Sequence, residues 1–269
     1  MFSSIYKKEP LKIEDNIPFF SKSDEYTDNY EKISSDHLKI MEKDNHNPFM
    51  DEELWNEMED STISLIKEFS KKGDKILDVG VGLGRLLSKV DLEDKYGMDI
   101  STGYLKVYSK KGINVCYSLI EDIPYKENMF DIVTCTDVLE HVLDLNNCVK
   151  NILSVLKPGG YFILRVPYKE DLEVYVNEPN YKFIHLRSFD EHSLRIFFEK
   201  IISCKFIKQS KIGYLVTNHR VKCQVPYIRD VIYRNLLRLK KRNITQNMYK
   251  KYSKIFLHEV EINFVVQKI

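Results

Sequence analysis

Residues 75–87 read KILDVGVGLGRLL: an apolar run, a turn with three glycines, and the start of a second apolar pattern. The apolar run predicts a buried strand over 75–79, and the pattern after the turn predicts a helix over about 83–90. Glycines at such a turn let the backbone approach a ligand closely, because no Cβ stands in the way. Their spacing is GxGxG rather than the GxGxxG of dinucleotide-binding proteins, so the turn indicates a nucleoside ligand without a pyrophosphate.

Strands and helices alternate along most of the chain. Apolar runs predict further strands at 94–100, 113–119, 130–135, 161–166, 201–209 and 255–267. Helical spacing of apolar residues predicts helices at 51–71, 101–111, 145–156, 188–200 and 227–241. Alternation of this kind predicts parallel βαβ units, and hence an α/β fold with a doubly wound, mostly parallel sheet.

Composition narrows the class of protein. The 269 residues carry 41 Lys+Arg against 40 Asp+Glu, and this balance argues against a general nucleic-acid-binding protein. The five cysteines form no C-x-x-C pair, so they support neither a zinc site nor a redox motif and fit a reducing compartment. Residues 1–10 lack the apolar core of a secretory signal, and no apolar run is long enough for a membrane span. We therefore expect a cytoplasmic protein.

The chain divides into an N-terminal arm and one main domain. Residues 1–50 are polar with scattered aromatic side chains, and two interpretations remain open: a loosely ordered extension, or a lid over the active site. The main domain is expected over 51–269, with an insertion at about 168–187 and a helical insertion at about 227–242.

Acidic residues stand where the predicted strands end. In an open α/β sheet, ligands bind beyond the carboxyl ends of the strands. Asp78 is placed to face a cationic group of the ligand, and Asp99, at the end of the second strand, to accept hydrogen bonds from ribose hydroxyls. After the third strand, Asp122 can accept a hydrogen bond from an adenine amino group while Ile123 packs on the ring. The alternative is that these residues have only a structural role, at a strand end or in a polar turn, and bind no ligand.

Several segments occur in one order. They are the glycine turn with Asp78, then Asp99, then EDIP at 121–124, FDIV at 130–133, VLEHV at 138–142 and LKPGG at 156–160. Together, over about residues 50–210, they resemble the class I S-adenosylmethionine-dependent methyltransferases, in the small-molecule, quinone-biosynthesis-like (type 11) branch.

The resemblance implies a Rossmann-like, seven-stranded sheet with an antiparallel last strand, and S-adenosyl-L-methionine as cofactor. It also implies cofactor contacts at Asp78, Gly80, Asp99, Asp122 and Ile123. We expect neighbouring residues to complete the cofactor site: Gly82, Gly84, Ile100, Glu121 and Asp137.

Two histidines are candidate general bases. Asp137, Glu140 and His141 follow the fourth strand and can meet on one side of a helical turn. Some quinone-type relatives bind magnesium with a similar arrangement that begins with Glu; here the first residue is the shorter Asp, so we expect no metal. His141 is then either a base or a support for the turn. His185, before the helix at 188–200, is the second candidate base or a helix-entry residue.

The sequence therefore predicts methyl transfer to a small-molecule acceptor, by O- or N-methylation. Candidate acceptors include a sugar, a nucleotide-sugar, a quinone precursor or another specialised metabolite. Two alternatives are an RNA methyltransferase, which would use the basic helix at 227–242, and a non-catalytic scaffold that binds S-adenosylmethionine. That helix is otherwise a solvated basic face, or a docking surface for a phosphorylated acceptor or anionic lipid. We expect no stable nucleic-acid partner; neither the acceptor nor the oligomeric state follows from the sequence.

Overall fold

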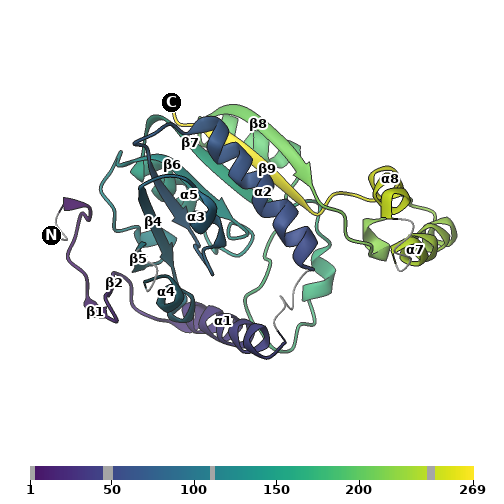
Figure 1. Cartoon of the computed structure of the whole chain (residues 1–269), viewed down its shortest axis with the longest axis horizontal. Helices are drawn as coiled ribbons and strands as arrows, with labels where there is room; N and C mark the ends of the chain where they lie inside the picture. The colour runs from purple at the N-terminus through teal and green to yellow at the C-terminus, as the bar shows by residue number, and fades with distance from the viewer. Residues whose placement is uncertain (1–3, 45–50, 110–112, 241–245) are drawn as a thin grey trace.

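A computed structural model describes residues 4–44, 51–109, 113–240 and 246–269. The remaining residues, which include parts of the predicted arm (1–50) and of the helical insertion (227–242), lie outside the described part. One mixed sheet forms the centre of the molecule (Figure 1). Its strands are β1 (Lys12–Glu14), β2 (Ile17–Phe19), β3 (Lys75–Val79), β4 (Asp94–Asp99), β5 (Asn114–Tyr117), β6 (Phe130–Thr136), β7 (Leu156–Pro167), β8 (Lys205–Ile212) and β9 (Glu261–Gln267).

The order of the strands confirms a doubly wound α/β fold. Across the sheet the order is β1-β2-β5-β4-β3-β6-β7-β9-β8. Strands β5, β4, β3, β6 and β7 are parallel, and β9 runs antiparallel between β7 and β8. The order reverses between β3 and β6, so the ligand site of such a fold is expected beyond the ends of these two strands.

The sheet has nine strands, so the expectation of seven was wrong. The two extra strands come from the N-terminal arm, where β1 and β2 form an antiparallel hairpin. Phe19 of β2 pairs with Tyr117 of β5, which extends the sheet beyond the edge of the usual core. These strands have three residues each, too few for apolar alternation to stand out in the sequence.

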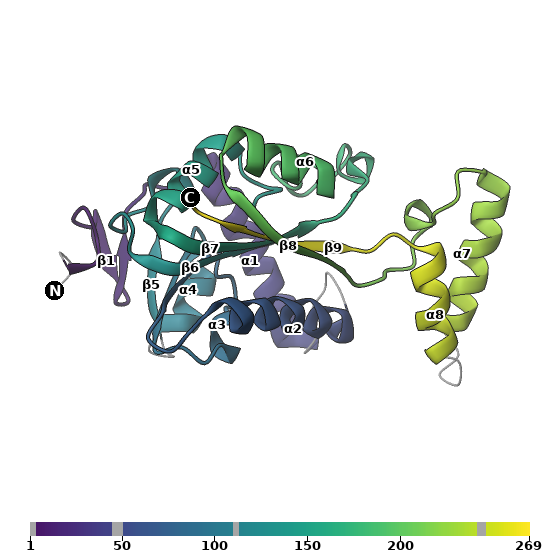
Figure 2. The ribbon, with the colours of Figure 1, turned by 90° about the horizontal axis from the view of Figure 1, so that it is seen from above.

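Helices cover both faces of the sheet (Figure 2). On one face lie α2 (Glu52–Phe69) and α3 (Arg85–Lys89); on the other lie α5 (Leu145–Val155) and α6 (Glu191–Arg195). Alternate strand residues enter opposite cores, as the pleat requires: Ile76 faces one core, whereas Leu77 faces the other. Short helical segments complete this part: 3₁₀ turns at Ile120–Asp122, Leu172–Tyr175 and Asn218–Arg220, and a π-helix at Ile196–Ile201.

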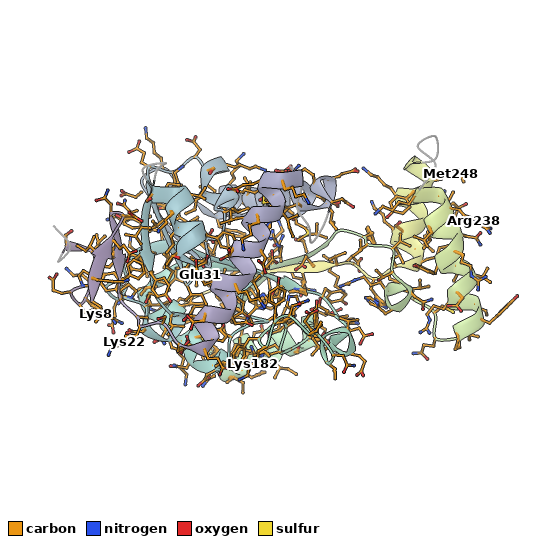
Figure 3. The ribbon with its side chains drawn as sticks, turned by 90° about the horizontal axis from the view of Figure 1, so that it is seen from below. Lys8, Lys22, Glu31, Lys182, Arg238 and Met248 are labelled. Carbon is orange, nitrogen blue, oxygen red and sulfur yellow. The ribbon has the colours of Figure 1, made fainter. Side chains whose placement is uncertain are left out.

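Helix α1 (Glu25–Asp44) packs against α4 (Thr102–Ser109). The Glu31 carboxylate accepts hydrogen bonds from both the backbone N–H and the hydroxyl of Thr102, each at 2.7 Å. Glu31 is labelled on α1 in Figure 3. Part of the arm is therefore fastened to the main domain by part-buried polar contacts.

Two helices, α7 (Pro226–Lys240) and α8 (Gln246–Phe256), project from the body of the molecule (Figures 1 and 2). The sequence predicted α7 but not α8, and the strand expected from residue 255 begins at Glu261. Tyr249, Tyr252 and Phe256 follow helical spacing, which the alternation of the following strand obscured. No helix within the described ranges combines the length and the apolar character that a bilayer span requires.

Candidate active site

The glycine turn follows β3 and adopts left-handed backbone angles. The φ angles of Gly80, Gly82 and Gly84 are +75°, +50° and +55°. A Cβ on Gly80 would lie 2.2 Å from Cγ2 of Val138, in the turn after β6. A Cβ on Gly82 would meet nothing closer than 4.0 Å. Gly80 thus lets two turns pack together, whereas the space beside Gly82 is open for a ligand.

Asp78 lies buried at the end of β3. Its Oδ1 accepts a 2.7 Å hydrogen bond from the hydroxyl of Thr134 in β6. Burial raises the pKa of Asp78 to about 7, and the nearby charge of Asp99 adds to this rise. A cation beside this carboxyl would favour its ionised form, so Asp78 suits a ligand that carries an ammonium group.

Asp99 fastens the glycine turn to β4. Its carboxylate accepts hydrogen bonds from the backbone N–H of Gly82, at 2.8 Å, and of Ser101, at 2.9 Å. Desolvation raises the pKa of Asp99 to about 6, although these backbone bonds lower it. Each carboxylate oxygen keeps a lone pair for a further donor, so Asp99 can still accept ribose hydroxyls. Ile100, beside it, is half-buried against the apolar core. We call Asp78, Gly80, Gly82, Gly84 and Asp99 the glycine-turn cradle.

The segment predicted to hold adenine contacts the N-terminal arm. Asp122 forms an ion pair with Lys8 and lies 3.5 Å from the hydroxyl of Ser21. Ile123 is buried in the core, and the backbone carbonyl of Glu121 accepts a hydrogen bond from Asn151. The arm therefore reaches the place where the sequence predicts the adenine ring.

Asp137 has a left-handed φ of +58° and forms an ion pair with Arg165 of β7. Arg165 is itself buried. Residues 137–141 form a turn rather than a helix, with the N–H of His141 donating to the carbonyl of Val138. The ion pair with the guanidinium holds Asp137 in place. Asp137 is not part of the one group of potential metal ligands found among the described residues, which consists of Glu140, His141 and His185.

His141 and His185 lie together, with ring centroids 4.7 Å apart. The Nδ1 of His141 donates to the carbonyl of Ile184 at 3.2 Å, which leaves a lone pair on Nε2. Burial lowers the pKa of His141 to about 4, so its imidazole is neutral at physiological pH and is a weaker base than a free imidazole. His185 pairs through Nδ1 with Glu170, which also accepts a hydrogen bond from Tyr175.

Glu140 is fully buried, and neither of its carboxyl oxygens has a hydrogen-bond partner within the described part of the chain. Burial, reinforced by the charge of Asp137, raises its pKa well above the usual range. One oxygen of Glu140 lies 3.8 Å from Nε2 of His141. Ligand atoms of Glu140, His141 and His185 all lie within 4.8 Å of one another, a donor set that suits a divalent transition metal. The expectation of no metal stays a prediction.

Sequence reasoning missed several polar groups around these histidines. Arg220 is buried and donates to the carbonyl of Glu259 at 2.7 Å, while its Nε has no partner among the described residues. Glu261, at the start of β9, is buried, and its Oε2 also has no hydrogen-bond partner among the described residues. Burial raises the pKa of Glu261 well above the usual range. The glutamate directly before the apolar run at 262–266 was the signal available in the sequence, but its burial was not. We call the following residues the buried polar cluster: Glu140, His141, Glu170, His185, Arg220 and Glu261.

Helix α1 covers the buried polar cluster. The ring of Tyr30 lies 5.4 Å from that of His141, and the hydroxyl of Tyr26 donates to the carbonyl of His141 at 3.4 Å. Asn29 donates to the carbonyl of Phe183 at 2.8 Å, which joins α1 to the insertion at 168–187. Lys182, labelled in Figure 3, pairs with Glu25 at the start of α1. Aromatic side chains from both segments thus surround the histidines.

The comparison with protein families identifies the domain that carries this site. Residues 77–164 match the methyltransferase-domain family, a range that includes the whole glycine-turn cradle, Glu140 and His141. The chain is 34% identical over 102 residues to ubiquinone biosynthesis O-methyltransferase of Bordetella avium, which covers 34% of this chain and 42% of that protein. It is 31% identical over 117 residues to phosphoethanolamine N-methyltransferase 2 of Caenorhabditis elegans, which covers 39% of this chain and 27% of that protein.

Other curated matches are uncharacterised proteins of Methanocaldococcus jannaschii, and the chain spans about half the length of these relatives: 53% and 50%.

Solved structures share the fold. A chain from the complex between the Haloferax volcanii Trm112 methyltransferase activator and a methyltransferase aligns with a TM-score of 0.60 at 14% identity, covering 90% of this chain and 96% of that one. Haemonchus contortus phosphoethanolamine N-methyltransferase 2, in complex with phosphomonomethylethanolamine and S-adenosylhomocysteine, aligns with a TM-score of 0.56 at 21% identity, covering 93% and 61%. The matched family therefore identifies residues 77–164 as a methyltransferase domain, and the solved structures show that methyltransferases share the fold of this chain.

Proposed function

We propose that this chain transfers a methyl group from S-adenosylmethionine to a small-molecule acceptor held at the buried polar cluster. The observation that carries the proposal is the contact between the two turns. Val138 packs on Gly80, and Glu140 and His141 follow it in the same turn. A ligand in the glycine-turn cradle would therefore lie beside the two residues best suited to meet an acceptor.

The cradle residues fit the parts of the cofactor. Asp78 would face its ammonium group and Asp99 its ribose. The open space beside Gly82 would leave room for the cofactor, in a turn that Gly80 and Gly84 shape with their left-handed φ angles. Ile100, Glu121, Asp122 and Ile123 are proposed at the adenine end, and Asp137 near the methionine end. When bound, S-adenosylmethionine supplies a methyl carbon already activated by its sulfonium. The protein's main task is therefore alignment, which can remove roughly 7–11 kcal/mol of barrier.

The buried polar cluster supplies acid–base groups for the acceptor. His141 is neutral, with Nε2 available, so it can take a proton from an acceptor hydroxyl. His185 is the second candidate base, and its pairing with Glu170 orients the ring. An amine acceptor that binds unprotonated needs no base for the methyl transfer itself. A base would be needed only afterwards, to take the proton that the methylated ammonium product releases. The named relatives from Bordetella avium and Caenorhabditis elegans, an O- and an N-methyltransferase, support a small-molecule acceptor of either kind.

The arm is proposed to close the site. Tyr26 and Tyr30 of α1 lie against His141, and Lys8 pairs with Asp122, so opening the arm would expose both ends of the site. Closure would exclude water from the sulfonium. All five cysteines are free, which fits the cytoplasmic location proposed for this enzyme.

Two measurements test the proposal. Calorimetry with S-adenosylmethionine should show binding to the folded protein; absence of binding would refute the cofactor assignment. Release of S-adenosylhomocysteine should then be screened against pools of hydroxyl and amine acceptors. Turnover only with RNA would favour the nucleic-acid alternative, and binding without turnover in any pool would favour a scaffold.

A further inference from the structure

The projecting residues 222–240 and 246–256, which we call the basic arm, differ in charge from the rest of the chain. They hold eight of the 41 lysines and arginines but one of the 40 acidic residues, so their formal net charge is +7 and that of all other residues is −6. The near-zero net charge of the whole protein therefore hides a strong separation. A cationic patch on an acidic protein predicts attraction to an anionic surface through this segment alone.

Some of these cations have partners in the body of the molecule, but others do not. Lys240 pairs with Asp51 at 3.4 Å, and Lys250 pairs with Glu53 at 2.9 Å, both at the start of α2. Arg234, Arg238 and Lys251 are exposed and have no acidic partner within the described part of the chain. Arg238 is labelled on the basic arm in Figure 3. Several charges are thus available for an external ligand.

The basic arm also exposes large apolar side chains. Seven of the sixteen exposed large hydrophobic residues among the described residues belong to it, although it is a small part of the chain. They are Val225, Tyr227, Ile228, Val231, Met248, Tyr252 and Ile255. Tyr227 is 78% exposed. Exposed apolar residues gathered in one segment are typical of an interaction site.

Cations and apolar residues share faces of the two helices. On α7, Tyr227, Val231, Arg234 and Arg238 follow one another at intervals of four, three and four residues, so they lie along one face. On α8, Met248, Lys251, Tyr252 and Ile255 do the same at intervals of three, one and three.

A groove of about 550 Å³ lies between α7 and α8, and it shares Arg238 and Tyr252 with these faces. It is lined from α7 by residues that include Leu239 and Arg238, and from α8 by Tyr252 and Phe256. The lining is mainly apolar, with the guanidinium of Arg238 as its charged group. Such a groove can take a hydrocarbon chain while the cation meets an anionic head.

We propose that the basic arm docks the protein on the surface of an anionic lipid bilayer. Its apolar residues would enter the boundary between headgroups and acyl chains, with Arg234, Arg238 and Lys251 contacting the headgroups. The bounded length of α7, 15 residues, suits a helix that lies in the interface and not one that crosses it. This inference is independent of the methyl-transfer proposal.

The mixture of side chains favours lipid over nucleic acid and over a second copy of the chain. RNA is bound by cations and by aromatic rings that stack on bases, and Tyr227 and Tyr252 offer such rings. The other five exposed apolar residues of the arm are aliphatic and offer no stacking surface: Val225, Ile228, Val231, Met248 and Ile255. A second copy could present its acidic body to the cations, but an acidic surface would leave those aliphatic residues against charged groups. A bilayer interface satisfies both features at once.

Co-sedimentation with vesicles tests the proposal. The full chain should bind vesicles of phosphatidylcholine that contain about a third phosphatidylglycerol, and bind more weakly as salt is raised. The triple variant Arg234→Gln, Arg238→Gln, Lys251→Gln should bind about a hundredfold more weakly, at about fivefold for each cation removed. The variant Tyr227→Ser, Ile228→Ser, Val231→Ser should bind at least about tenfold more weakly.

A matched control removes three exposed lysines from the body: Lys150→Gln, Lys200→Gln, Lys205→Gln. This variant should retain vesicle binding, and circular dichroism should show that every variant is folded. Equal binding to neutral phosphatidylcholine vesicles, or equal loss in the control, would overturn the proposal. Binding to single-stranded RNA, or salt-sensitive dimers by light scattering, without vesicle binding would overturn it in favour of those partners.

Discussion

The glycine-turn cradle and the buried polar cluster adjoin one another, yet they differ in how the chain builds them. The cradle comes from 22 consecutive residues, 78–99, spanning the ends of two neighbouring strands. The cluster takes its side chains from four segments between Glu140 and Glu261, and α1 covers it. The residues of the cradle are close in sequence, whereas those of the cluster come together only in the complete tertiary fold.

This difference extends to hydrogen bonding. In the cradle, Asp78 and Asp99 each have protein donors. In the cluster, Glu140, Glu261 and Arg220 carry buried polar atoms without partners among the described residues. Buried polar atoms without partners are costly, so the cluster is the part whose hydrogen bonding a ligand should complete. The cradle has its hydrogen bonds in place, whereas the cluster keeps polar atoms that a ligand could pair.

Replacing His141 gives the largest expected effect and separates the two halves. His141→Gln should lower turnover of a hydroxyl acceptor by about 10²–10⁴-fold, because the general base is lost. The affinity for S-adenosylmethionine, measured by calorimetry, should stay the same, because His141 belongs to the cluster alone. His185→Gln serves as the comparison and should cost less if His185 only orients the site. A parallel loss of cofactor affinity in His141→Gln would show that the halves are not separable.

Gly80→Ala should damage the contact between the halves. The new Cβ would meet Val138 at 2.2 Å and would sit on a backbone with φ of +75°. Left-handed strain and overpacking together predict a loss of about 2–5 kcal/mol in the free energy of unfolding, with weaker cofactor binding.

Gly159→Ala is the matched control for Gly80→Ala. Gly159 has a φ of +78° but nothing within 4 Å of its would-be Cβ. It should lose only the strain, about 1–2 kcal/mol, and keep cofactor affinity. Adding Val138→Ala should restore part of the stability of Gly80→Ala. Equal losses in the two glycine variants, by urea unfolding, would remove the steric explanation.

The same contrast explains what the sequence could predict. The glycine spacing, the strand-end acids and the apolar runs are local signals, and from them the doubly wound fold and the cradle followed. His141 and His185 were candidates, but 43 residues lie between them, and only the tertiary fold brings their rings together. Arg220 and Glu261 lie in segments with no motif, so their burial depends on packing that periodicity does not report. The hairpin of β1 and β2 escaped prediction because each strand has three residues.

Asp99→Ala should weaken cofactor binding by roughly 1.5–3 kcal/mol, the usual contribution of hydrogen bonds to a charged group. Asp94→Ala is the control, since Asp94 is exposed at the opposite end of the same strand. Adenosine should lose affinity with Asp99→Ala as the full cofactor does, because both carry the ribose. Unchanged dissociation constants for both ligands would reject the ribose assignment and leave Asp99 as a support for the glycine turn.

The smallest expected effect is a pH dependence that distinguishes the two acids of the cradle. Asp78 must be ionised to pair with the ammonium group, and its pKa in the free protein is about 7. Below pH 7 the carboxyl is protonated, so affinity for S-adenosylmethionine should fall as pH falls, by about tenfold between pH 8 and pH 6. Asp78→Asn should bind more weakly and lose this slope. Adenosine, which lacks the ammonium group, should show no such change around pH 7. If adenosine follows the same curve, the titrating group acts on the nucleoside, and Asp78 faces a different part of the ligand.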